Sequence, residues 1–279
     1  MIAFSFTRHL ALAALAFTTI SLHAHHGHDF ILLEDWHLAA PGKGHLLTNF
    51  EWEHSGDGDE YGLAPSLMFG IAPRVALSLD VDFRDESDGW NYNAVMPAAH
   101  FQVTGPDSDL PFKVALSVGY QWADGAAGAD GEEPADEHGD EHHDDHADEH
   151  QGGHDHEHMG HDHSHASSVH NHDSDALMSR LIIERDFGAT KAVFNLISVA
   201  RSDGGASWGY AAGVRHKVRE QLAFGIEALG DFESHGWHEL VGGVYYEPVH
   251  SLTLKLGAGF GLTEETPDFT LRTGFVWRF

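Results

Sequence analysis

Segments of about ten residues with alternating apolar and polar side chains recur along this sequence, and they restrict its fold more than any other feature. In the clearest, residues 74–84, one face holds Val75, Leu77, Leu79, Val81 and Phe83, and the other holds Arg74, Ala76, Ser78, Asp80, Asp82 and Arg84. Segments 112–122 and 251–260 repeat the pattern. Successive side chains of a β-strand point to opposite sides, so this period predicts an all-β fold.

Alternation alone fits a soluble β-sandwich as well as a membrane barrel. Aromatic residues favour the barrel because they gather at segment ends: Phe50, Trp52, Tyr61, Trp90, Tyr92, Tyr120, Trp122, Trp208, Tyr210, Trp237, Tyr245 and Tyr246. Amphipathic rings in those places suit the two interfaces of a membrane. We therefore predict a single antiparallel transmembrane β-barrel, in which closure gives every backbone group a partner. The sandwich is the alternative.

The barrel is expected over residues 44–279 with about twelve strands. We place them near 44–54, 60–71, 74–84, 92–104, 112–122, 177–187, 191–201, 207–217, 221–231, 237–247, 250–260 and 268–279. Short and long connections alternate, as periplasmic turns and outer loops do. The poorly alternating segments 92–104 and 191–201 leave ten or fourteen strands open.

Charges expected on the inner face carry both signs, which favours a narrow or internally bridged lumen over a wide pore. They are Arg74, Asp80, Asp82, Arg84, Lys113, Glu227, Lys255, Arg272 and Arg278.

The N-terminus has the order of a secretory signal peptide over residues 1–24. One positive side chain precedes the apolar run Leu10–Ile20, and Ala24 stands where cleavage would fall. The run is too short to span a membrane as a helix. Residues 25–43 would then be an N-terminal, histidine-containing periplasmic segment. Within it, 30–40 fits either a short amphipathic helix or a strand in the barrel mouth.

The last residues alternate as well: Phe269, Leu271, Thr273, Phe275, Trp277 and Phe279 share one face, and the sequence stops on Phe279. Here it resembles the outer-membrane β-barrel proteins of Gram-negative bacteria, whose final strand typically ends in an aromatic residue read by the barrel-assembly machinery. The resemblance covers the last strand closely and the rest only as a pattern. It implies an outer-membrane location, with lipid and the assembly machinery as partners. An even number of strands, twelve, puts both termini in the periplasm.

Residues 123–176 differ from the rest in composition. They hold 17 Asp and Glu, 13 His and no Lys or Arg, so they carry −17 of the formal charge of −29. Such a segment cannot bury enough apolar surface to order itself, which predicts a long disordered loop. The strand count places this loop on the extracellular side. So acidic a chain would be repelled by nucleic acid. It has no cysteine, which excludes disulfides and thiolate metal sites.

The histidines of this loop predict binding of a divalent transition metal. They are His138, His142, His143, His146, His150, His154, His156, His158, His161, His163, His165, His170 and His172. Imidazoles with interspersed carboxylates suit Zn²⁺, which we favour, and also Ni²⁺ or Cu²⁺, whereas Ca²⁺ and Mg²⁺ prefer oxygen ligands. In composition only, the loop resembles the His-rich loops of outer-membrane proteins tied to zinc uptake. His25, His26 and His28 form a second candidate set.

The predicted function is therefore a metal-binding outer-membrane barrel that assists metal uptake, buffering or passage. A structural or adhesive barrel with an incidental acidic loop is the first alternative. An outer-membrane hydrolase using Asp231, Ser234, His235 and His238 is a weaker one, because no nucleophile motif marks those residues. We expect no enzymatic activity.

Overall fold

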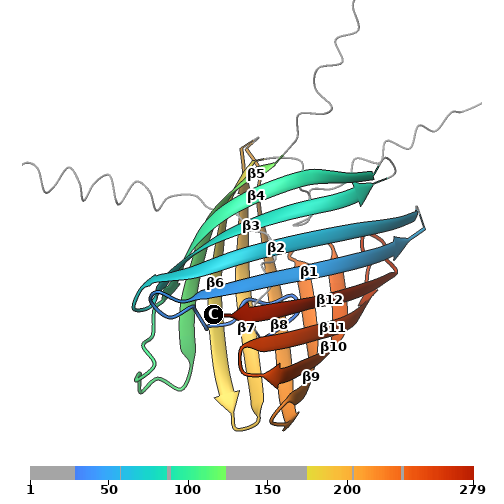
Figure 1. The fold of residues 1–279 in the computed structure, drawn as a ribbon. Helices are drawn as coiled ribbons and strands as arrows, with labels where there is room; N and C mark the ends of the chain where they lie inside the picture. Colours follow the sequence, from blue (N-terminus) through green and yellow to red (C-terminus); the bar gives the residue numbers. More distant parts are fainter. Residues whose placement is uncertain (1–28, 57, 87–88, 124–174, 203, 234–235) are drawn as a thin grey trace, which may run out of the picture.

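A computed structural model describes residues 29–56, 58–86, 89–123, 175–202, 204–233 and 236–279. Twelve β-strands make up the fold (Figure 1): β1 Gly44–Ser55, β2 Gly58–Ala72, β3 Val75–Glu86, β4 Gly89–Gln102, β5 Lys113–Ala123, β6 Ala176–Phe187, β7 Thr190–Arg201, β8 Ala206–Arg219, β9 Leu222–Asp231, β10 His238–Val249, β11 Leu252–Gly261 and β12 Phe269–Arg278. The prediction of twelve strands is confirmed, and the observed bounds lie within a few residues of those expected.

The strands form one closed antiparallel barrel in which each strand pairs with its neighbours in sequence. Closure occurs between β1 and β12, from His45 opposite Arg278 to His54 opposite Phe269. The chain end takes part, because the Phe279 amide donates to the Gly44 carbonyl at 2.9 Å and the Gly44 amide donates back at 3.0 Å. The sheet therefore has no open edge, as a bilayer requires. No helix in the described part of the chain could cross a membrane.

The outer face of the barrel is apolar. On β3, Leu77 and Leu79 are 45% and 47% exposed, whereas Ala76 and Ser78 on the inner face are 0% and 7% exposed. Large exposed rings lie toward both ends of the barrel: Trp90, Tyr92, Trp122 and Trp208 at one end, and Phe187, Tyr246, Trp277 and Phe279 at the other. An apolar band between two aromatic girdles is the surface that a bilayer selects.

Three of the orientations expected from the sequence are wrong. Tyr245 and Trp237 were expected at the interface but are 1% and 5% exposed, and they face inward. The Tyr245 hydroxyl donates to Glu227, and the Trp237 amide donates to Asp231 at 3.0 Å. Arg74 was expected in the lumen but lies on a turn, with a φ of 70°, where its exposed side chain donates to the Gln102 carbonyl.

The two ends of the barrel differ in their connections. At the turn end, short links join the strands at 73–74, 188–189, 220–221 and 250–251, with a longer one at 103–112, and both Gly44 and Phe279 lie there. At the loop end, the connections are 56–57, 87–88, 124–175, 202–205, 232–237 and 262–268. The His-rich segment therefore leaves and rejoins the barrel at the loop end.

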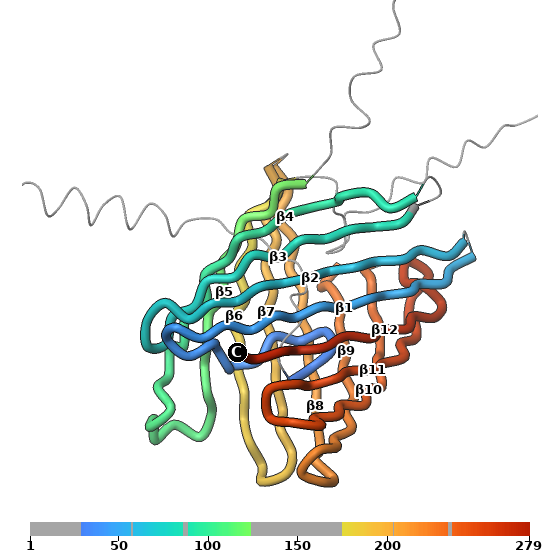
Figure 2. Tube along the Cα trace, viewed as in Figure 1, coloured from blue at the N-terminus to red at the C-terminus, as the bar shows by residue number. Residues whose placement is uncertain are grey.

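Residues 29–40, named here the luminal segment, lie inside the barrel (Figures 1 and 2). From the sequence, residues 30–40 were expected to form a short amphipathic helix or a strand. They form neither, since these residues contain no helix and no strand. The segment joins β1 through a sharp turn. There Gly42 has a φ of 75° and donates its amide to the Gly70 carbonyl at 2.9 Å.

Gly70→Ala should lower the stability of the folded barrel by about 1–3 kcal/mol. A Cβ at Gly70 would lie 2.2 Å from the carbonyl oxygen of Ala39 and 2.3 Å from that of Ala40, so the end of the luminal segment would have to shift. Gly242→Ala is the matched control, because nothing lies within 4 Å of its Cβ position. Urea unfolding of both variants in lipid vesicles measures the difference. Equal unfolding midpoints would contradict this packing.

Candidate functional site

The luminal segment follows the inner wall of the barrel and meets the strands one after another. Phe30 contacts β11 and β10, residues 31–33 contact β9, Glu34 contacts β7, and Trp36 contacts β6 and β4. Pro41 then bridges to Gly70 of β2 before β1 begins. An isolated segment of this kind must send its backbone hydrogen bonds to side chains, because it has no ladder of its own.

Glu227 of β9 is the main acceptor for that backbone. Its Oε1 accepts the Ile31 amide at 2.8 Å, and its Oε2 accepts the Leu32 amide at 2.7 Å and the Leu33 amide at 3.3 Å. The Tyr245 hydroxyl donates to the same carboxylate. Glu227 is 0% exposed, so a buried charge is offset by several donors directed at it.

Four further wall side chains bind the main chain of the segment. The Asn195 side chain binds both backbone polar groups of Glu34. Its oxygen accepts the backbone amide of Glu34 and its nitrogen donates to the backbone carbonyl, each at 3.0 Å. Glu184 accepts the Trp36 amide at 3.2 Å, and Gln102 donates to the Trp36 carbonyl at 3.1 Å. Lys255 donates to the Phe30 carbonyl. The inner wall thus supplies polar groups where this one segment needs them.

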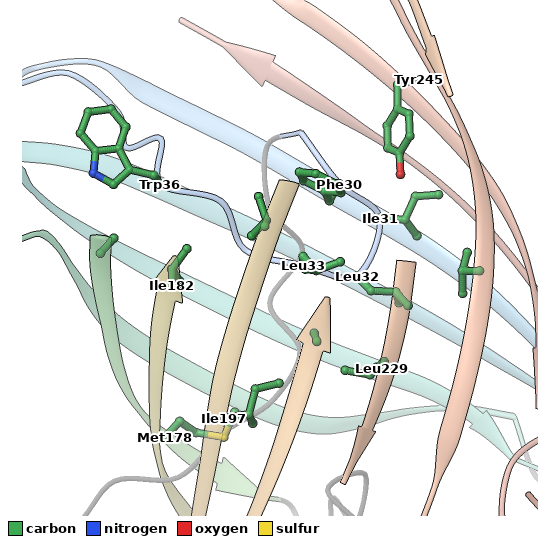
Figure 3. Close-up of a cluster of buried hydrophobic side chains, with 14 of the residues drawn as sticks. Phe30, Ile31, Leu32, Leu33, Trp36, Met178, Ile182, Ile197, Leu229 and Tyr245 are labelled. Carbon is green, nitrogen blue, oxygen red and sulfur yellow. The ribbon is translucent and has the colours of Figure 1, made fainter. Parts of the chain in front are cut away.

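Apolar side chains of the segment form a buried cluster with the wall (Figure 3). Phe30, Ile31, Leu32, Leu33 and Trp36 are all at most 7% exposed. Their wall partners come from β4 to β10 and from the loop before β10: Met96, Ala115, Met178, Ile182, Val193, Ile197, Val199, Ala211, Ala223, Leu229, Trp237, Val241 and Tyr245. The segment therefore packs against seven consecutive strands of the wall, β4 to β10.

Positively charged side chains of the wall bind the acidic residues on both sides of the apolar run Phe30–Leu33. Asp29 pairs with Lys191 and, at 2.8 Å, with Arg215. Glu34 pairs with Arg180 of β6 at 3.1 Å and lies 3.8 Å from the ring of His100. The expectation of an internally bridged lumen is met by these pairs.

One group in the described residues has the composition of a metal site: Asp29, Asp35 and His37, whose ligand atoms lie within 4.8 Å of one another. Lys191 already stands among them, bound to Asp29 and 3.3 Å from His37 Nδ1. Burial acts to lower the pKa of His37, but the hydrogen bond and charge of Asp35 outweigh it and raise the pKa above its ordinary value. A protein cation and a ring that favours its proton make this group unsuited to a divalent metal.

A second charged cluster lines the loop half of the lumen. Arg84 reaches Asp82 at 3.4 Å, Glu51 at 3.7 Å and Glu53 at 3.9 Å. Arg272 reaches Glu51, Glu239 and, at 3.7 Å, Glu53. Four carboxyl groups thus share two guanidinium groups.

A cavity of about 560 Å³ lies on the turn-end side of the luminal segment. The segment contributes Asp29, His37, Leu38 and Ala40 to its lining, and β1 and β12 contribute His45 and Arg278 among others. Among the described residues, the packing around the segment is therefore unequal and is looser on its turn-end side.

The histidines predicted to bind metal lie outside the described residues, both the thirteen from His138 to His172 and the set His25, His26 and His28. The structure does describe where the segment with the thirteen histidines joins the barrel. Asp175 accepts the Ala123 amide and the Tyr120 hydroxyl, each at 3.1 Å, which ties the two ends of the segment together at the end of β5.

The structure describes two of the four residues considered for a hydrolase, Asp231 and His238. Asp231 accepts the amides of Glu233 and Trp237, each at 3.0 Å, and so stabilises the β9–β10 loop. The ring of His238 lies 3.3 Å from the Tyr210 hydroxyl. Ser234 and His235 lie outside the described residues.

The sequence resembles no known family closely: no protein-family model matches it, and no curated protein does. Solved structures do match the fold. The KdgM porin has a TM-score of 0.52 at 9% identity, covering 84% of this chain and 98% of its own. The COG4313 outer membrane channel from Pseudomonas putida F1 has 0.53 at 11%, covering 88% and 98%, and the NanC porin has 0.51 at 8%, covering 83% and 98%.

These likenesses establish the fold. The chain is a closed twelve-stranded barrel of the outer-membrane type, with a lipid-compatible exterior and its own N-terminal segment inside. The lumen, with the segment that occupies it, is the candidate functional site.

Proposed function

We propose that this protein is an outer-membrane barrel that binds Zn²⁺, or a similar divalent transition metal, through the histidines of residues 123–176 and passes it through a lumen that the luminal segment normally closes. The metal binding follows from the sequence of that segment. The control of passage follows from the occupied lumen. In the membrane, the loop end would face outward, the turn end would face the periplasm, and Phe279 would have served assembly of the barrel.

The observation that carries the proposal is the fit between the luminal segment and the wall. Glu227 accepts three consecutive backbone amides of the luminal segment, whose residues 30–36 are all buried. A wall built in this way keeps the segment in place, which favours a closed resting state over an open high-flux pore. The cavity on the turn-end side gives the segment room to move.

The carboxyl groups of the loop half support a cation as the species that is passed. The cluster of Glu51, Glu53, Asp82 and Glu239 with two arginines lies on the same half as the attachment of the His-rich segment. A metal captured by imidazoles at that end would next meet carboxylates. Such a gradient of ligands attracts cations and leaves them exchangeable.

Zinc influx into liposomes that contain a zinc-sensitive dye tests this function. We expect slow influx for the wild-type protein and influx at least about tenfold faster when Glu227→Ala loosens the luminal segment, because loss of one buried acceptor leaves several unsatisfied donors. Phosphate or chloride should not follow at a comparable rate. Equal influx for both proteins, or faster movement of anions than of zinc, would contradict the proposal.

A further inference from the structure

The luminal segment is held in a way that resembles a bound ligand more than a part of the barrel. The β-ladder closes between β1 and β12 without using any residue before Gly44. Outside the turn at residues 40–43, the segment contacts the wall through side chains of the wall and not through strand pairing. The wall therefore forms a site that the segment fills.

The wall recognises mainly the backbone of its occupant. Five side chains from five strands bind main-chain groups between Phe30 and Trp36, namely Lys255, Glu227, Asn195, Glu184 and Gln102. Backbone groups are the same in every peptide. Hydrogen bonds to them select a peptide backbone in this bent conformation and not one sequence.

The wall also provides space for large apolar side chains. Gly213 of β8 would place a Cβ 3.0 Å from Leu33 Cδ1, and Gly243 and Gly257 of β10 and β11 would place theirs 2.8 and 2.4 Å from Ile31 Cδ1. Glycine leaves room here that any other residue would take from the occupant. Phe30 packs edge-on against Tyr245, with ring centroids 6.3 Å apart.

Charge fixes the ends of the occupant. Lys191 and Arg215 bind the carboxylate before the apolar run, and Arg180 binds the carboxylate after it. The recognised pattern is a bent stretch of four apolar residues with an acidic residue on each side.

We propose that the lumen is a binding site for short apolar peptides with flanking acidic residues, bound in a bent conformation, and that the luminal segment occupies it as a tethered competitor. The inference rests on the proposed function only in that departure of the segment opens the site. A peptide supplied from outside would then compete with the tethered segment and return the barrel to the closed state.

The test uses the full-length protein with Leu33→Glu, which prevents the tethered segment from docking, and a fluorescent synthetic peptide with the sequence of residues 29–40. We expect saturable binding to this variant, at least tenfold weaker binding to the wild type, and block of any current that the variant carries. A peptide N-methylated at Ile31 and Leu32 should bind at least about tenfold more weakly, because it loses two of its three amide donors to Glu227. A peptide of the same composition in scrambled order controls for adsorption to lipid.

The outcomes separate the two proposals. If the variant conducts but the peptide neither binds nor blocks, or if the scrambled and N-methylated peptides bind equally well, the peptide site is wrong while closure by the segment stands. If the peptide binds specifically to a variant that does not conduct, the peptide site stands and closure is wrong. Should Leu33→Glu fail to assemble, judged by heat-modifiable mobility on a gel, the double variant Ile31→Ala with Leu33→Ala takes its place with the same expectations.

Discussion

Leu33→Glu should convert a closed barrel into an ion-conducting one. The Leu33 side chain is 0% exposed, and its amide lies 3.3 Å from Glu227 Oε2, so a new carboxylate would be buried near an existing one. Burial of an unpaired charge costs on the order of 5 kcal/mol. A change of that size shifts an equilibrium between docked and undocked segment by roughly 10³- to 10⁴-fold. Single-channel recording in planar bilayers should show frequent, long openings.

Leu33→Met is the matched control for this prediction, since it keeps the volume and apolarity of the side chain and should keep the barrel closed. Both variants must first show the heat-modifiable mobility of a folded barrel. A folded Leu33→Glu protein as silent as the wild type would contradict closure by the luminal segment. So would a wild type that already conducts steadily.

Replacing the thirteen histidines between His138 and His172 with asparagine should remove zinc binding. The apparent affinity for Zn²⁺ should fall by more than about 100-fold, because loss of second-shell partners alone costs 10- to 100-fold. Binding to the unchanged protein should be weaker at pH 6 than at pH 7.5, since protonated imidazole has no free nitrogen for the metal. Calorimetric titration in detergent measures both effects.

The control for this replacement is His250→Gln, at an exposed position on the turn end that lies far along the barrel from the His-rich attachment. It should leave zinc binding unchanged. If the asparagine variant still binds zinc fully, the thirteen histidines are not the metal ligands. The segment would then be an incidental acidic loop, and the barrel would be structural or adhesive.

The strands could be predicted because every one of them has one face toward lipid and the other toward the lumen, and each environment selects the same kinds of side chain on every strand. A side chain of β3 or β11 either meets hydrocarbon or does not, and the sequence alternates accordingly. The poor alternation of segment 191–201, which forms most of β7, has its cause inside the barrel. On β7 the inward residues Val193, Ile197 and Val199 are apolar because they pack against the luminal segment, so apolar residues stand on both faces of that strand.

The luminal segment itself could not be placed from the sequence, because its contacts follow no period. Each of its backbone groups meets a different wall residue, such as Glu227, Asn195 or Glu184, at positions scattered along the chain. One signal was present. Phe30 to Leu33 are four consecutive apolar residues outside every predicted strand, and such a run has to be buried somewhere. Tyr245 and Trp237 were misplaced for the same reason, since they face that run and not the membrane.

The position of the luminal segment in the membrane-inserted protein can be measured by cross-linking, because the chain has no cysteine of its own. In the double variant Leu33→Cys with Gly213→Cys, the two thiols would lie close together. The reason is that Leu33 Cδ1 now lies 3.0 Å from the position that a Cβ would take at Gly213. We expect rapid disulfide formation by this pair in liposomes under mild oxidation, and none by Leu33→Cys with Gly242→Cys, whose second position faces outward. No cross-link in the first pair, or equal cross-linking in both, would show that the segment does not occupy the lumen.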